Sequence, residues 1–305
     1  GRTGEMLFFE YSVRPPYMRY GVVSATGEQL SLIPIELPGP RLPHDMAITE
    51  HYSILMDLPV CVDTEALQRG RWRSVYRPEL GSRFAVIPRH GKAEDVRWFK
   101  AEPCYIYHVV NSWEEGDEVI MVAHKVAKPV ANSDESTASE FERMLQNLQM
   151  NAELWEWRFN LQTGETAERC LDTVNAEFPT TNPRDQGYPT RYGYAVTIGP
   201  LPTLRFDGIR KYDFASGEHQ EVRFGPGIYG SESPFAPSTV ATAEDQGYLL
   251  SFVQDELNER SELWIYDARN LQAGPCTRLA IPQRVPLGFH ACWVEGKDLK
   301  AKAPA

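Results

Sequence analysis

The sequence predicts an all-β protein, and three observations favour this fold class. Short runs rich in Val, Ile, Tyr, Phe and Trp are separated by Gly, Pro, Asn and Asp, which is the pattern of strands and turns. A strand and turn unit recurs at a regular spacing in the second half of the chain. Helical spacing of apolar residues is convincing in one segment, residues 136–150, which we expect to be a packed surface helix.

Strand-like runs follow one another along the chain. The run at residues 6–11 comes directly after Thr3-Gly4-Glu5, which is typical of the second half of a hairpin turn. Because the chain starts within a hairpin, we expect it to lack its own beginning. Further strands are expected at residues 20–23, 52–56, 83–87, 104–107, 154–160, 209–214, 248–253 and 263–267.

The repeated unit consists of a strand, a turn and a second strand. Its aromatic positions Phe159, Tyr212 and Tyr266 are 53 and 54 residues apart. The turns that accompany it are Thr163-Gly164, Ser216-Gly217 and Gly274, with weaker copies at Thr26-Gly27 and His90-Gly91. A unit of about 50 residues is typical of a β-propeller blade, and about five such units fit this length. No linker divides the chain, so we expect residues 1–305 to form a single β-propeller domain.

Composition narrows the class of protein and its partners. The chain has 305 residues, of which 42% are hydrophobic and 24% charged, as in ordinary globular proteins. A net charge of -11 argues against nucleic acid, because phosphate binding needs clustered Lys and Arg. The five cysteines have no Cys-x-x-Cys spacing and fit buried thiols in a reducing compartment. With no run of about 18 apolar residues, we expect a cytoplasmic protein.

One motif in the sequence is misleading. Residues 225–230 match Gly-x-Gly-x-x-Gly, but a dinucleotide site would need a helix directly afterwards. Pro234 and Pro237 lie where that helix would have to run. We therefore interpret this segment as a turn. The HExxH, Walker A and GxSxG motifs are absent from the sequence.

Three of the seven histidines, His44, His108 and His290, lie at strand ends among apolar or small residues. In a propeller the innermost strands of successive blades converge on the central axis. Neutral imidazoles gathered there would suit a divalent metal such as Fe, Zn or Cu. The other four histidines are expected to be surface or structural residues: His51, His90, His124 and His219.

Five blocks of sequence surround these histidines. Residues 43–50 read Pro-His-Asp-Met-Ala-Ile-Thr-Glu, residues 107–114 read Tyr-His-Val-Val-Asn-Ser-Trp-Glu, and residues 288–293 read Gly-Phe-His-Ala-Cys-Trp. The other two blocks are residues 175–179 with 191–194, and residues 230–237. In their order along the chain, and over almost its whole length, the five blocks resemble those of the carotenoid cleavage oxygenase family. That family includes the retinal pigment epithelium isomerase and the lignostilbene-cleaving enzymes.

The resemblance implies a seven-bladed β-propeller of which this chain contains about five blades and lacks the N-terminal ones. It also implies an Fe(II) cofactor held by four histidines, three of which correspond to His44, His108 and His290. The fourth ligand of the family precedes a turn ending in Thr-Gly-Glu, so it would fall upstream of Gly1. Family glutamates that accept hydrogen bonds from the ligand histidines correspond to Glu177 and Glu232.

The activity implied by the resemblance is oxidative cleavage of a conjugated carbon-carbon double bond in a carotenoid or apocarotenoid. O2 would be the co-substrate and aldehydes the products, with no catalytic residue beyond the metal site. An apolar tunnel would hold the polyene, and the candidates to line it are Tyr107, Trp113, Phe178 and Phe289. Family members often collect lipophilic substrates from membranes, so peripheral membrane contact is also expected.

Other functions stay open at this point. A stilbenoid substrate is the alternative within the enzyme class, because the residues that recognise a phenol lie in the N-terminal part of the lignostilbene-cleaving enzymes. A truncated, non-catalytic propeller is the alternative outside it, and iron content discriminates between the two classes. A propeller hydrolase with a calcium site would need carboxylate and Asn ligands on the axis instead of imidazoles.

Overall fold

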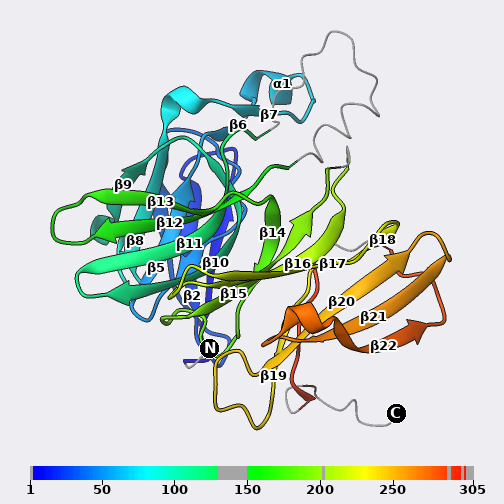
Figure 1. Ribbon diagram of the computed structural model, residues 1–305. Coiled ribbons are helices and arrows are strands. Elements are labelled where there is room, and N and C mark those ends of the chain that lie inside the picture. The colour runs from blue at the N-terminus through cyan, green and yellow to red at the C-terminus, as the bar shows by residue number, and fades with distance from the viewer. Residues whose placement is uncertain (1–2, 130–149, 201–202, 287–289, 297–298, 300–305) are drawn as a thin grey trace, which may run out of the picture. The chain divides into compact units, whose positions relative to one another are not determined.

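Figure 1 shows the computed structural model, which describes residues 3–129, 150–200, 203–286, 290–296 and 299. The predicted helix at residues 136–150 lies outside these residues except for Met150. The chain divides into two compact units, each of which is described by itself. The first unit comprises Gly1–Pro179, Arg184–Thr190 and Ile198–Leu204, and the second comprises Thr180–Pro183, Arg191–Thr197 and Arg205–Ala305.

Strands are the main regular structure of the described residues. The first strands are β1 (Met6–Tyr11), β2 (Tyr17–Val23), β3 (Gln29–Glu36), β4 (Ala47–Ile48), β5 (Tyr52–Asp57), β6 (Val60–Val62), β7 (Ser74–Tyr76), β8 (Ser82–Pro88), β9 (Arg97–Ala101), β10 (Tyr105–Glu115) and β11 (Glu118–Val126). The later strands are β12 (Glu153–Asn160), β13 (Thr166–Asp172), β14 (Ala176–Thr180), β15 (Tyr192–Ile198), β16 (Phe206–Asp213), β17 (His219–Arg223), β18 (Ile228–Tyr229), β19 (Phe235–Pro237), β20 (Gly247–Asp255), β21 (Arg260–Asp267) and β22 (Pro275–Ile281).

Helices are short in the described part of the chain. They are α1 (Thr64–Gln68) and the 3-10 helices Pro78–Leu80, Ala93–Asp95 and Leu271–Ala273. None of them is long and apolar enough to cross a membrane. The prediction of an all-β protein is therefore confirmed.

The strands form small sheets in which chain neighbours are also neighbours in space. Their orders are β1-β2-β3, β4-β5-β8-β9, β10-β11-β12-β13, β14-β15-β16-β17 and β18-β20-β21-β22, with β19 paired to β20 and a separate ribbon β6-β7. The strands pair antiparallel, as β10 does with β11 and β20 with β21. Short connections between adjacent antiparallel strands account for the dominance of Gly, Asn and Asp between the apolar runs.

The five turns of the sequence repeat occupy the same place in five sheets. They join β2 to β3, β8 to β9, β12 to β13, β16 to β17 and β21 to β22, which are the last two strands of each sheet. Asn160 and Asp213 each accept a hydrogen bond from the backbone N–H three residues later, at 2.9 and 3.3 Å. Gly164 and Gly217 follow with φ of 79° and 75°, which glycine adopts readily. The repeat thus marks one kind of hairpin, while the number of blades stays a prediction.

Both faces of β5 and β8 are buried in the first unit. Ile54 and Phe84 belong to one apolar cluster, and their chain neighbours Leu55 and Ala85 belong to another. Alternate side chains of a strand point to opposite faces, so this sheet has a core on each side. The repeat aromatic Phe159 is fully buried and lies 5.1 Å from the ring of Phe84, centroid to centroid.

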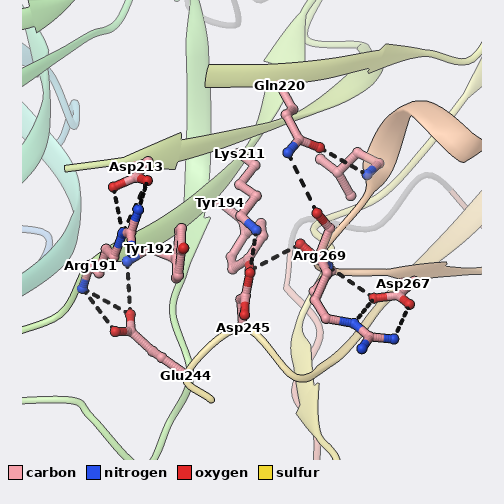
Figure 2. A network of polar contacts seen from close by, with 12 residues as sticks. Arg191, Tyr192, Tyr194, Lys211, Asp213, Gln220, Glu244, Asp245, Asp267 and Arg269 are labelled. Carbon is pink, nitrogen blue, oxygen red and sulfur yellow. Dashed lines mark hydrogen bonds and ion pairs between the residues drawn. The ribbon is translucent and has the colours of Figure 1, made fainter. Parts of the chain in front are cut away.

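A polar network holds a loop of the second unit, as Figure 2 shows. Glu244 accepts hydrogen bonds from the backbone N–H groups of Arg191 and Tyr192 at 3.0 and 2.7 Å. The next residue, Asp245, forms an ion pair of 2.7 Å with the buried Lys211, whose Nζ lies 4.2 Å from the ring centroid of Tyr192. The two adjacent carboxylates therefore anchor the loop to β15 and β16.

The turn predicted in residues 225–230 is present at residues 226–227. Gly225 and Gly227 have φ of 103° and 71°, and the chain then enters the two-residue strand β18 without a helix. A left-handed backbone at two closely spaced positions explains the glycines without any dinucleotide.

His124 lies inside the first unit, fully buried on β11. Burial disfavours the charged imidazolium and lowers the pKa of His124 to about 4, with a smaller contribution in the same direction from His108. Glu177 and Asp172 act in the opposite direction but are outweighed. His124 is thus a structural residue of the core, not a surface residue.

The buried His124 should make stability depend on pH. Its folded pKa lies below the unfolded value of about 6.5, so the unfolded chain takes up the proton first as pH falls. The stabilisation is complete above about pH 6.5 and is lost by about pH 4, which amounts to roughly 3 kcal/mol. We expect the free energy of unfolding of His124→Asn, measured with urea, to decline less over this pH interval than that of the parent protein. His219→Asn, which changes an exposed residue at the start of β17, should keep the pH dependence of the parent protein. An equal pH dependence in His124→Asn would contradict the prediction.

Candidate metal centre

His44 lies in an extended segment just before β4 and is held against β10. Its Nδ1–H donates to the carbonyl oxygen of Tyr107 at 3.0 Å. Its ring stands edge-on to the rings of Tyr107 and His108, at centroid distances of 5.2 and 4.9 Å. Partial desolvation lowers the pKa of His44, and the neighbouring His108 lowers it further. The ring is therefore kept neutral near neutral pH.

His108 lies at a bulge in β10. The register between β10 and β11 shifts on both sides of Val109, so Tyr107 and His108 together face the single residue His124. A bulge leaves backbone groups without partners in the ladder and re-aims the side chains around it. This irregularity explains how a residue of a long strand can turn its ring toward His44, with the two ring planes at 86°.

The segment at residues 44–46 binds the backbone of this bulge. The Tyr107 carbonyl accepts the hydrogen bond from His44, and Val109 N–H donates to Asp45 Oδ2 at 2.8 Å. The other oxygen of Asp45 accepts from Met46 N–H, also at 2.8 Å. Backbone groups displaced from the ladder are thus bound by two consecutive side chains.

Glu177 on β14 fixes the ring of His108. Nδ1–H of His108 donates to Glu177 Oε2 at 2.7 Å, and the same oxygen accepts from the backbone N–H of Phe178. Glu177 is fully buried, and its Oε1 has no hydrogen-bond partner within the described residues. A buried carboxylate with one unpartnered oxygen is costly unless a cation is near, so this corner of the fold suits a bound metal.

Phe178 has an unusual backbone conformation beside this carboxylate. Its φ of 51° is rare for a bulky residue and marks local strain. The ring of Phe178 is buried and lies 4.7 Å from that of His108, centroid to centroid. The strained residue therefore packs an apolar surface against the candidate ligand.

His290 has the corresponding arrangement in the second unit. Its Nδ1–H donates a hydrogen bond to Oε2 of Glu232 at 3.2 Å. The same oxygen accepts from the backbone N–H of Ala291 at 2.6 Å. The side chain of His290 is 61% exposed, whereas that of Glu232 is 15% exposed. A carboxylate thus orients an accessible imidazole.

All three candidate ligands share one tautomer. Each histidine uses Nδ1 to donate to an oxygen that can only accept, so Nε2 carries the lone pair. This is the form in which imidazole binds Fe, Zn or Cu, and a hydrogen bond on the far nitrogen sets the ring orientation. The donor set therefore fits Fe(II). No three His, Cys, Asp or Glu side chains of the described residues already gather as a metal site, so the complete ligand set stays a prediction.

Other residues of the blocks at residues 43–50 and 107–114 link these two segments to each other. Ser112 Oγ–H donates to the carbonyl of Ile48 at 2.6 Å, and Thr49 Oγ1–H donates to Glu114 at 2.5 Å. Asn111 is buried and donates to backbone carbonyls in the loop at residues 185–188. These contacts explain why the block at residues 107–114 needs polar residues beyond its histidine.

The predicted tunnel residues differ in their positions. Tyr107 and Phe178 lie beside the rings of His44 and His108. Trp113 is buried on β10, while Phe289 falls outside the described residues. The lining of a tunnel by these four residues stays a prediction.

The remaining histidines behave as surface or structural residues. His51 and His90 are mostly exposed and pair with Glu114 at 2.8 Å and Glu5 at 3.3 Å. Asp45 was not among the predicted site residues, although it stands next to His44 in the same block. The signal for it was that adjacency, because a side chain beside a candidate ligand can bind backbone groups close to that ligand.

Comparison with known proteins shows to which family the chain belongs. The chain matches the family of the retinal pigment epithelial membrane protein over residues 1–295. It is 34% identical to carotenoid 9,10(9',10')-cleavage dioxygenase 1 of Phaseolus vulgaris, over 99% of this chain and 57% of that protein. It is 30% identical to the zeaxanthin 7,8(7',8')-cleavage dioxygenase of Crocus sativus, over 97% of this chain and 80% of that protein. The chain thus spans little more than half the length of several curated relatives.

Solved structures agree on the fold. The lignostilbene dioxygenase of Pseudomonas brassicacearum superposes with a TM-score of 0.85 at 26% identity, over 97% of this chain and 64% of that one. A cobalt-substituted oxygenase of Synechocystis gives a TM-score of 0.82 at 23% identity, over 95% of this chain and 60% of that one. These neighbours are β-propellers, which confirms the predicted fold class. The chain belongs to the retinal pigment epithelial membrane protein family, which is the family of carotenoid cleavage oxygenases.

Proposed function

We propose that this chain carries the iron centre of a dioxygenase that cleaves a conjugated double bond of a carotenoid or apocarotenoid. The observation that carries the proposal is the tautomer shared by His44, His108 and His290. Relatives with 34% and 30% identity that are named carotenoid cleavage dioxygenases give it independent support. One oxygen atom of O2 enters each aldehyde product, so the reaction balances without a further oxidant or reductant.

The residues of the chain would divide the work as follows. Nε2 of each of the three histidines would bind Fe(II), which supplies the one-electron chemistry that triplet O2 needs to react with an alkene. Glu177 and Glu232 hold the Nδ1 protons of two ligands and bring negative charge close to the cation. For His44 the uncharged Tyr107 carbonyl has the same orienting role.

The substrate would lie against the apolar surface beside the ligands. Phe178 packs on His108, and the ring of Tyr107 lies against His44. Burial raises the pKa of the Tyr107 phenol, so this side chain stays neutral at physiological pH. Trp113 and Phe289 are proposed to extend the lining. A water-poor surface of this kind suits a polyene, which offers no hydrogen-bonding group at the bond to be cleaved.

A stilbenoid substrate is the second candidate. It is favoured by the TM-score of 0.85 with a lignostilbene dioxygenase. The identity to that structure is 26%, against 34% to the Phaseolus vulgaris carotenoid enzyme, so we place the carotenoid class first. A non-catalytic propeller would retain the fold but bind no iron.

Substrate class can be tested directly with the intact protein. We expect the Fe(II)-loaded protein to consume O2 and to release aldehydes from a carotenoid or an apocarotenal, detected by chromatography. A hydroxystilbene supplied in parallel should react slowly or not at all. Cleavage of the stilbene alone would establish the second candidate, and no turnover of any substrate by iron-loaded protein would contradict the oxygenase proposal.

Iron content provides a test that does not depend on substrate. We expect stoichiometric Fe(II) in the purified protein and a large loss of bound iron in His108→Ala, because removal of one imidazole leaves an incomplete ligand set. His219→Ala is the matched control, since that histidine is exposed at the start of β17. Equal iron content in the two variants would remove His108 from the ligand set.

We also propose that this protein is cytoplasmic and contacts membranes peripherally. Trp72 is 62% exposed on the connection between α1 and β7. Residues 69–77 contain four arginines and no acidic residue, although the whole chain has a net charge of -11. A Trp flanked by Arg suits the interface of an anionic bilayer, where the ring enters the headgroup region and the cations pair with phosphates.

Vesicle binding tests this contact. Trp72→Ser should reduce cosedimentation of the protein with vesicles that contain anionic phospholipid, and added salt should reduce binding of the parent protein. Leu257→Ser changes an apolar residue of the second unit that is 73% exposed and should leave binding unchanged. A parent protein that stays in the supernatant at low salt would contradict the proposal.

A further inference from the structure

We propose that Asp45 is a positioning residue that sets the geometry of both His44 and His108 by binding the backbone of the β10 bulge. The inference rests on the proposed metal centre. Asp45 would not touch the metal or the substrate. It would act on His108 through the peptide groups on either side of that residue. It would act on His44 through the backbone that joins the two residues.

The contacts of two consecutive residues place His108 between two hydrogen bonds. On its N-terminal side, the carbonyl of Tyr107 accepts from His44 Nδ1–H at 3.0 Å. On its C-terminal side, Val109 N–H donates to Asp45 Oδ2 at 2.8 Å. The His-Asp pair therefore grips the peptide groups that flank His108. Because the register shifts at this point, neither the Tyr107 carbonyl nor the Val109 N–H is placed for a regular ladder hydrogen bond with β11.

The carboxylate of Asp45 is itself held rigidly. Oδ1 accepts from Met46 N–H at 2.8 Å, so each of its two oxygens binds one backbone donor. Burial raises the pKa of Asp45, and the side chains that oppose this shift are those of His108 and His44. An acceptor whose two oxygens each bind a backbone N–H is suited to orientation and not to proton transfer.

The geometry that Asp45 would preserve is the relation between the two rings. Their centroids are 4.9 Å apart and their planes are at 86°. The two rings come from distant segments of the chain, because His44 and the Tyr107 carbonyl that it contacts are 63 residues apart. Metal affinity depends on how closely such rings are held to the productive geometry. Loss of an outer hydrogen-bond partner in metal sites typically weakens binding by about 10- to 100-fold.

A nearby contact provides a matched control. Ser112 Oγ–H donates to the carbonyl of Ile48 at 2.6 Å and joins the same two segments, four residues beyond each histidine. Ser112→Ala removes a buried hydrogen bond between these segments but leaves the bulge intact. A purely structural role for Asp45 would give the two variants the same effects.

The test is a Co2+ titration of the intact, metal-free protein, followed by visible absorption. Asp45→Asn keeps the side-chain volume, but its single amide oxygen can accept from only one of the two backbone donors. We expect Co2+ affinity to fall by about 10- to 100-fold in Asp45→Asn, with an altered absorption band that reports changed ligand geometry. Asp45→Ala, which loses both hydrogen bonds, should bind more weakly still. Ser112→Ala should keep the parent affinity and spectrum.

Near-ultraviolet circular dichroism of each metal-free protein verifies the fold before titration, and Asp45→Asn remains informative where Asp45→Ala unfolds. Parent-like affinity and spectrum in Asp45→Asn would overturn the inference and leave the metal centre intact. Equal weakening in Asp45→Asn and Ser112→Ala would also overturn it, because any loosening of the two segments would then suffice. A parent protein that binds no Co2+ would contradict the proposed metal centre and the inference together.

Discussion

The hydrogen bond that each candidate histidine donates from Nδ1 is the interaction on which the proposed chemistry depends. A neutral imidazole has one N–H, so an acceptor placed at Nδ1 directs the lone pair of Nε2 toward a metal. The acceptors differ: a backbone carbonyl for His44, a fully buried carboxylate for His108 and a loop carboxylate for His290. Their common effect on the tautomer is achieved by different local structures.

Two irregularities of the backbone lie beside these acceptors. β10 is interrupted by a bulge beside His108, and Phe178 adopts a left-handed φ next to Glu177. Register shifts also occur between β2 and β3, between β12 and β13, and between β21 and β22, so a bulge by itself does not mark a site. The bulge in β10 differs in that its backbone groups bind the side chains of His44 and Asp45. The bulge exposes backbone groups that His44 and Asp45 can bind.

Much of the fold could be predicted from local pattern. Apolar runs bounded by turn residues identified the strands, and the spacing of Phe159, Tyr212 and Tyr266 identified the third strand of successive sheets. The bulge could not be predicted, because it arises from a mismatch in register between residues 106–109 and residues 123–125. For a related reason the sequence predicted only that His124 is a surface or a structural residue, and did not decide between the two. A histidine followed by Lys125 reads as a polar position, yet both faces of β11 are covered.

The sequence by itself determined the fold class and the turn chemistry, and the resemblance of its five blocks to a known family identified the candidate ligands. The fold class and the turns follow from side-chain period and glycine conformation, which act over a few residues. The tertiary structure alone decided which nitrogen of each histidine carries its proton and what Asp45 binds. The acceptors of His44, His108 and His290 lie 63, 69 and 58 residues away in the chain. Contacts over such separations are set by sheet register and packing, which no local pattern specifies.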